Sequence, residues 1–97
     1  PMNIKDVVDK KYKFSRADEG KVLHFYPTET TKIILPPAEN FDSGTQFYVY
    51  NFSLEEITIE TEDGSELFAR HHRLLRKYDD AVVYTDGKRW FATGDLS

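Results

Sequence analysis

Residues 81–93 read AVVYTDGKRWFAT, and this stretch is the clearest indication of the fold class. Runs rich in β-branched and aromatic residues stand on both sides of Asp86-Gly87, at residues 81–85 and 89–93. An Asp-Gly pair between two such runs is a strong signal for a tight β-hairpin, because glycine reaches the positive φ angle that the turn requires. We therefore expect two neighbouring antiparallel strands here.

Similar runs precede this hairpin along the chain. Turn residues separate them, including Pro36-Pro37, which cannot donate to a sheet ladder, and a second Asp-Gly pair at Asp63-Gly64, which predicts a second hairpin. The further strands expected are residues 21–26, 31–35, 45–52, 56–61 and 66–69. Residues 71–78 are too few for a stable isolated helix and are expected to form a loop.

Alternation within the runs shows which side chains are buried. Ile57 and Ile59 face one side of their strand and Thr58 and Glu60 the other, as in a sheet with one solvated face. The fold class expected is all-β, a compact antiparallel β-sandwich or barrel-like domain over residues 20–97. Sandwich and barrel share the same alternation, so both remain open.

The first 19 residues differ in charge and pattern. Residues 1–16 hold five basic and two acidic side chains, a net charge of +3, whereas residues 17–97 carry −7. Because this segment shows no sustained alternation, we expect an extended N-terminal arm over residues 1–19. It is either a frayed terminus or a tether for a neighbouring chain. Its candidate partner-binding residues are Lys10, Lys11, Lys13 and Arg16.

Composition excludes several classes of protein. Ninety-seven residues, 39% of them hydrophobic, make one domain, and no apolar run approaches the roughly 20 residues that cross a bilayer. Without cysteine there is no disulfide, thiol nucleophile or thiolate metal site. The net charge of −4 argues against nucleic acid as a ligand, since phosphate binding needs a basic surface.

One strand carries aromatic side chains on both faces. In residues 45–52, Phe47 and Val49 point one way and three aromatic residues point the other. One set fills the core, and the other leaves an aromatic patch typical of contact surfaces, unless loops or the arm cover it. Trp90 is expected to pack back over the sandwich. The candidate self-association or sugar-stacking surface comprises Tyr48, Tyr50, Phe52, Arg73, Arg76 and Trp90.

Two segments of opposite charge lie in the second half of the chain. Residues 70–77 hold four cations and no acid, and residues 55–66 hold six acids. They are either solvated faces with weak internal ion pairs or complementary patches between copies of the chain.

No arrangement for catalysis is recognisable. The glycines form neither a Walker loop nor a dinucleotide fingerprint. His71 and His72 are candidate metal ligands, but neighbouring residues on a strand point to opposite faces, and no zinc-type spacing accompanies the two histidines. We expect no catalytic residue, no metal and no cofactor, and read both histidines as surface or subunit-contact residues.

Ordered motifs in residues 20–97 resemble a small β-rich module of tailed-bacteriophage virion proteins. They are GKVLHF at residues 20–25, TKIILP at 31–36, FDSGTQFYVYNFS at 41–53, ITI at 57–59, AVVYTDGKRW at 81–90 and GDL at 94–96. The resemblance implies a β-sandwich or barrel-like building block of tail fibres, tailspikes or capsid surfaces, often trimeric, with no catalytic residues. Residues 60–75, which read ETEDGSELFARHHRLL, are more charged than the family pattern.

The function expected from these features is structural. The chain is predicted to be a non-enzymatic virion protein, a capsid decoration or cement protein that binds and stabilises the assembled shell through its arm. Its partners would be virion proteins and further copies of itself. The alternative is a tail-fibre or tailspike module that binds host-surface carbohydrate.

Overall fold

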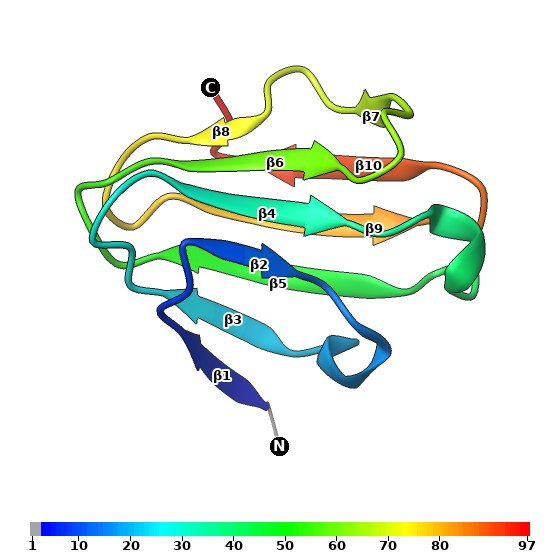
Figure 1. Cartoon of the computed structure of the whole chain (residues 1–97), viewed down its shortest axis with the longest axis horizontal. Coiled ribbons are helices and arrows are strands. Elements are labelled where there is room, and N and C mark those ends of the chain that lie inside the picture. Colours follow the sequence, from blue (N-terminus) through cyan, green and yellow to red (C-terminus); the bar gives the residue numbers. More distant parts are fainter. Residues whose placement is uncertain (1–2) are drawn as a thin grey trace.

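The computed structural model of the chain describes residues 3–97, which form two packed β-sheets (Figure 1). The elements are β1 (Ile4–Val7), β2 (Lys11–Lys13), η1 (Arg16–Asp18), β3 (Val22–Phe25), β4 (Thr31–Leu35), η2 (Ala38–Asn40), β5 (Gln46–Asn51), β6 (Ile57–Thr61), β7 (Leu67–Phe68), β8 (Arg73–Leu74), β9 (Asp80–Thr85) and β10 (Trp90–Gly94). Within residues 3–97, no helix has the length and hydropathy needed to span a membrane.

The chain passes from one sheet to the other after almost every strand. Sheet A has the order β1-β3-β5-β9-β10-β7, and sheet B has the order β2-β4-β6-β8. In Figure 1, β2 and β4 of sheet B cross in front of β5 and β9 of sheet A. The strands from β1 to β6 therefore wind like the coils of a small β-solenoid.

The all-β class is confirmed, but the antiparallel arrangement is wrong for most strand pairs. Five of the eight pairings seen in residues 3–97 are parallel, among them β1 with β3, β3 with β5, and β4 with β6. From β1 to β6 each connection carries the chain to the opposite sheet, and successive strands of the same sheet run in the same direction. Side-chain alternation is identical in both arrangements and does not distinguish them.

Only one of the two expected hairpins forms. Asp86-Gly87 joins β9 to β10, which pair antiparallel with Thr85 opposite Trp90. Asp63-Gly64 also makes a turn, with φ of +77° at Gly64, but it leads from β6 in sheet B to β7 in sheet A. In residues 71–78, expected as a loop, two residues form the short strand β8 beside β6.

The expected extended arm is also wrong for the residues that the structure describes. β1 pairs with β3 and β2 with β4, and Val7, Tyr12 and Phe14 are buried in the core. Strands of four and three residues are too short to show a period in sequence, and their pairing partners are supplied by distant segments. Pro1 and Met2 of the arm lie outside the described residues.

A buried carboxylate stabilises the first coil of the chain, which comprises β1, β2 and η1. Asp18, at the end of η1, is fully buried and accepts a 2.7 Å hydrogen bond from the Tyr12 hydroxyl. The Lys5 ammonium donates to the same hydroxyl at 2.7 Å and lies 3.3 Å from the Asp18 carboxylate. The three residues come from β1, β2 and η1, so one polar cluster connects the edge strands of both sheets.

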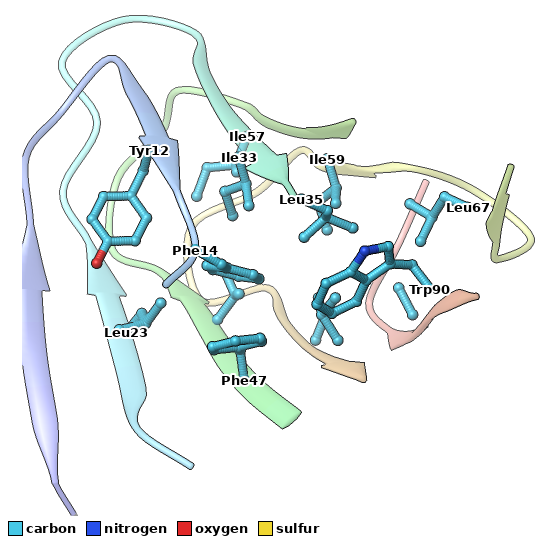
Figure 2. Close-up of a cluster of buried hydrophobic side chains, with 14 of the residues drawn as sticks. Tyr12, Phe14, Leu23, Ile33, Leu35, Phe47, Ile57, Ile59, Leu67 and Trp90 are labelled. Atoms are coloured by element: carbon cyan, nitrogen blue, oxygen red, sulfur yellow. The ribbon is translucent and has the colours of Figure 1, made fainter. Parts of the chain in front are cut away.

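The hydrophobic core fills the space between the sheets. The inward side chains include Leu23, Phe47 and Trp90 from sheet A and Ile33 and Ile59 from sheet B, each at most 1% exposed (Figure 2). The rings of Phe14 and Phe47 stack at 4.1 Å between their centroids. Both inner faces are therefore used, and the two outer faces remain for solvent or partners.

Candidate functional site

The two outer faces of the molecule differ in chemistry. Sheet B turns charged side chains outward, and several form ion pairs within the chain, such as Lys32 with Glu60 at 3.6 Å and Arg73 with Glu56 at 3.7 Å. Such a face is typical of a solvated surface. None of the large exposed hydrophobic residues among positions 3–97 lies on a strand of sheet B.

Sheet A turns apolar and aromatic side chains outward. We call this surface the aromatic face; its strand residues are Ile4, Val22, His24, Tyr48, Tyr50, Phe68, Val82, Tyr84 and Phe91. All of them are half-buried or exposed, and Ile4 reaches 57% exposure. No strand of the described chain lies over this face, because sheet B packs against the opposite side.

The strand register arranges these side chains in rows across the sheet. The central row runs from Ile4 through Val22 and Tyr48 to Val82 and Thr93. A second row lies two residues away toward the β9–β10 hairpin and contains Gln46, Tyr84, Phe91 and Phe68. A third row lies two residues away in the opposite direction and contains Asp6, His24, Tyr50 and Asp80. The apolar central row is therefore flanked by an aromatic row and by a row that contains two carboxylates.

Near the β9–β10 hairpin the rings form one stack. Tyr84 lies on Phe91 at 5.1 Å with nearly parallel planes, and Phe68 follows at 5.6 Å. The Arg89 guanidinium lies over Phe68 and Phe91 at 5.5 and 5.4 Å from their centroids. It also donates from Nε and Nη2 to the Asp86 carboxylate. This end is aromatic and carries the guanidinium of an ion pair between Arg89 and Asp86.

The opposite end carries a second stack. Phe52 lies between Tyr50, at 4.6 Å, and Tyr26, at 5.3 Å, and His24 is 4.7 Å away. Tyr78 meets the edge of Phe52 although its backbone has a φ of +76°, which is strained for any residue except glycine. Strain of this kind persists where the surrounding structure imposes it, and it is frequent at binding surfaces.

A hollow of about 280 Å³ opens between the two stacks. The side chains of Val22, His24, Tyr48, Tyr50 and Asp80 line it. Tyr50, on one side of the hollow, belongs to the second stack together with Phe52.

Asp80 lies at the rim of this hollow beside a second carboxylate. Its backbone N–H donates to the Asp95 carboxylate at 3.1 Å. Burial raises the pKa of Asp80 above its ordinary value of 3.8, and the neighbouring Asp95 raises it further. No ion pair to either carboxylate is formed by a cation within residues 3–97.

The structure brings together only part of the surface predicted from sequence. Tyr48, Tyr50 and Phe52 do lie together on one face, and the strand alternation that separated them from the core is confirmed. Trp90 is only 1% exposed and belongs to the hydrophobic core, so its expected packing against the body of the protein is confirmed and its place on a contact surface is wrong. Arg73 lies on β8 in the other sheet.

Arg76 lies near the end of sheet A but not among the aromatic rings. It is exposed and lines a small polar hollow of about 180 Å³ with Asp79 and Asp95. Its backbone N–H donates to the Asp79 carboxylate at 3.0 Å.

Three of the four basic residues assigned to the predicted arm make polar contacts within the chain. Lys10 forms an ion pair with Glu29 at 3.3 Å, and Lys13 forms one with Glu62. Arg16 donates two hydrogen bonds to the backbone oxygen of Asn40, at 2.8 and 3.0 Å. Lys11 is exposed on the outer face of sheet B. These residues lie on the body of the molecule and do not reach away from it.

His71 and His72 are both exposed beside β8. They line a shallow hollow of about 450 Å³ together with Arg70 and Arg73, whose positive charges disfavour a cation. Residues 3–97 contain no group of three or more histidine, aspartate and glutamate side chains that could hold a metal ion.

Sequence reasoning missed half of the aromatic face. Val82, Tyr84 and Phe91 flank the Asp86-Gly87 turn, and their alternation with the buried Val83 and Trp90 is visible in the sequence. That alternation could have identified these side chains as outward-facing. It could not show that they lie beside Tyr48 and Tyr50, because this depends on the pairing of β5 with β9 and of β9 with β10.

Comparison of the chain with models of protein families, with curated proteins and with solved structures found no match.

Proposed function

We propose that this chain is a non-enzymatic structural module that assembles with further copies of itself through the aromatic face of sheet A. The observation that carries the proposal is the difference between the outer faces. Sheet B presents paired charges, as a solvated surface does, whereas sheet A presents two stacks of rings joined by Val22, Tyr48 and Val82. Apolar surfaces of this extent mark protein contacts.

The size of the face suits a second copy of the chain. The two longer dimensions of the Cα trace are 32 and 31 Å, and the broad faces of both sheets lie in the plane of these two dimensions (Figure 1). Covering one such face buries on the order of 800 Å² per partner, which is the usual size of a stable protein interface. Two identical flat faces satisfy each other about a two-fold axis, because each copy offers and receives the same patch.

The resemblance of the sequence to virion modules suggests where such an oligomer would act, namely on a virus particle. A homo-oligomer that binds an assembled shell would act as a capsid decoration or cement protein, since binding to the assembled state stabilises it and many weak contacts reinforce one another. The trimer implied by the resemblance is the competing copy number. In the tail-fibre alternative the aromatic face would stack on glycan, but the buried Trp90 takes no part in it.

The mass of the chain in solution tests the assembly. We expect sedimentation equilibrium to show a concentration-dependent oligomer for the wild type and a monomer for Tyr84→Glu, because a charge at this position would be desolvated in the interface. Lys11→Glu is the control, since it also introduces a carboxylate and Lys11 is exposed on β2, on the outer face of sheet B. A wild-type monomer at all concentrations would overturn the proposal.

Location tests the virion setting. Antibody labelling of intact phage particles from the encoding strain is expected to decorate the capsid surface. Label confined to the tail would support the tail-fibre alternative, and particles without label would exclude both. Point variants are preferable to deleting residues 1–16, because such a deletion removes β1, β2 and the buried Tyr12 and Phe14.

A further inference from the structure

The aromatic face is electrically polar along its strands. At the hairpin end, Arg89 lies over Phe68 and Phe91 and has Nη1 free of the hydrogen bonds that hold Nε and Nη2 to Asp86. At the other end lie Asp6, Asp80 and Asp95, with His24 as the one titratable base of that row. The apolar central row separates the two ends.

We infer that two copies of the chain pair antiparallel on this face, with Arg89 of each copy over the Asp80–Asp95 pair of the other. This inference rests on the proposed function and adds the orientation of the copies and the contact that sets it. The opposite orientation would place like charges against each other, which is unfavourable when they are desolvated.

The register determines where the groups meet. Phe91, under the Arg89 guanidinium, lies two residues before Thr93 of the central row, and Asp95 lies two residues after Thr93, directly beyond the end of β10. A two-fold axis along the central row exchanges these two positions. Aligned sheets pack within about 30° of each other, which keeps such positions in contact.

The acidic pair is suited to receive an external cation. Asp80 and Asp95 stand side by side without an ion pair from residues 3–97, and their mutual repulsion is relieved when a guanidinium approaches. The pKa of the Asp80 carboxyl is raised mainly by burial, and the neighbouring Asp95 raises it further in the single copy. Arginine is the suitable partner because its planar fork can contact both carboxylates.

Charge reversal tests the orientation. We expect Arg89→Glu alone and Asp80→Lys alone each to weaken self-association by about tenfold or more, because each places like charges together. An equimolar mixture of the two variants is expected to restore pairing to within about threefold of the wild type, since both contacts become opposite in sign in the mixed pair. Lys88→Glu is the matched control, one residue away with the same charge change and no contact to the rings.

A second measurement separates this inference from the proposed function. The chain has no cysteine, so a single Val82→Cys in the central row gives a clean attachment point for a short bis-maleimide cross-linker. Cross-linking at Val82 and not at Lys32→Cys on sheet B confirms pairing through the aromatic face. If Val82→Cys cross-links but the charge variants do not rescue each other, the antiparallel orientation is wrong and the proposed function stands. If neither occurs, both are wrong. Circular dichroism confirms that each variant is folded.

Discussion

The indole nitrogen of Trp90 donates a 2.7 Å hydrogen bond to the backbone oxygen of Pro36. Trp90 begins β10 in sheet A, and Pro36 directly follows β4 in sheet B, so this bond joins the two layers 54 residues apart in sequence. It also satisfies the single polar atom of a side chain that is 1% exposed. The largest aromatic residue of the chain therefore belongs to the core and not to the binding face.

Replacing Trp90 with phenylalanine should lower the free energy of unfolding by about 1–3 kcal/mol, because the buried Pro36 oxygen loses its donor and the smaller ring leaves space. Urea unfolding followed by circular dichroism measures this. Tyr84→Phe, on the aromatic face, is the control and should change stability by less than about 0.5 kcal/mol. An equal loss of unfolding free energy in the two variants would show that the hydrogen bond from Trp90 to Pro36 does not stabilise the fold.

Gly94 marks a close approach of two strands. It has a φ of +137°, and a Cβ there would lie 2.5 Å from the backbone oxygen of Asp80 and 2.7 Å from the Cα of Ala81. Gly94→Ala should therefore destabilise the chain by more than Gly44→Ala, which has a φ of +91° but open space around it. We expect about 1–2 kcal/mol for Gly44→Ala and at least about 3 kcal/mol for Gly94→Ala in thermal unfolding. A smaller loss for Gly94→Ala would show that β9 and β10 can separate there.

Asp18→Asn should loosen the first coil before the rest of the molecule. The amide keeps the shape of the side chain but weakens its bonds to the Tyr12 hydroxyl and the Lys5 ammonium. Hydrogen exchange is expected to accelerate at the amides of residues 4–14 and to stay unchanged in β9 and β10. Asp6→Asn, an exposed acid on β1, serves as the control, and uniform acceleration along the chain would contradict a local role.

Asp80→Asn should act in opposite directions on folding and on association. Because the folded chain raises the pKa of Asp80 above 3.8, it binds a proton more tightly than the unfolded chain, and the stability of the single copy increases as pH falls through the raised pKa toward 3.8. The amide removes the repulsion with Asp95, so the variant should be slightly more stable at neutral pH and lose this pH dependence. Denaturant titrations from pH 3 to 7 measure the effect.

The same variant should pair more weakly, since it offers Arg89 one carboxylate fewer. For the same reason, wild-type association should weaken as pH falls through the raised pKa of Asp80 and should weaken with added salt. Sedimentation equilibrium across pH and ionic strength checks both. Tighter pairing at acidic pH would contradict the contact between Arg89 and the acidic pair.

Several strands and much of the core could be read from the sequence. The run at residues 31–35 coincides with β4, the Asp86-Gly87 hairpin forms as expected, and Phe47 and Val49 are buried while Tyr48 and Tyr50 face outward. These features depend on alternation and on turn residues, which are local properties of the chain.

The first coil and the route of the chain could not be read in the same way. Tyr12 is buried because β4 and β3 supply its surroundings from distant parts of the sequence, including Phe25 at 5.7 Å. Asp63-Gly64 has the residues of a hairpin but leads to the opposite sheet, because a tight turn fixes only local dihedral angles and not which layer the next strand joins.

Alternation and turn residues are sufficient to identify a β-protein and to assign the apolar side of each long strand. The parallel pairing of most strands, and the position of Tyr48, Tyr84 and Phe91 on one face with an acidic and a basic end, became visible only in the folded chain. Alternation has a period of two residues and assigns each side chain to a face, whereas strand order and register depend on pairings between segments far apart in the chain.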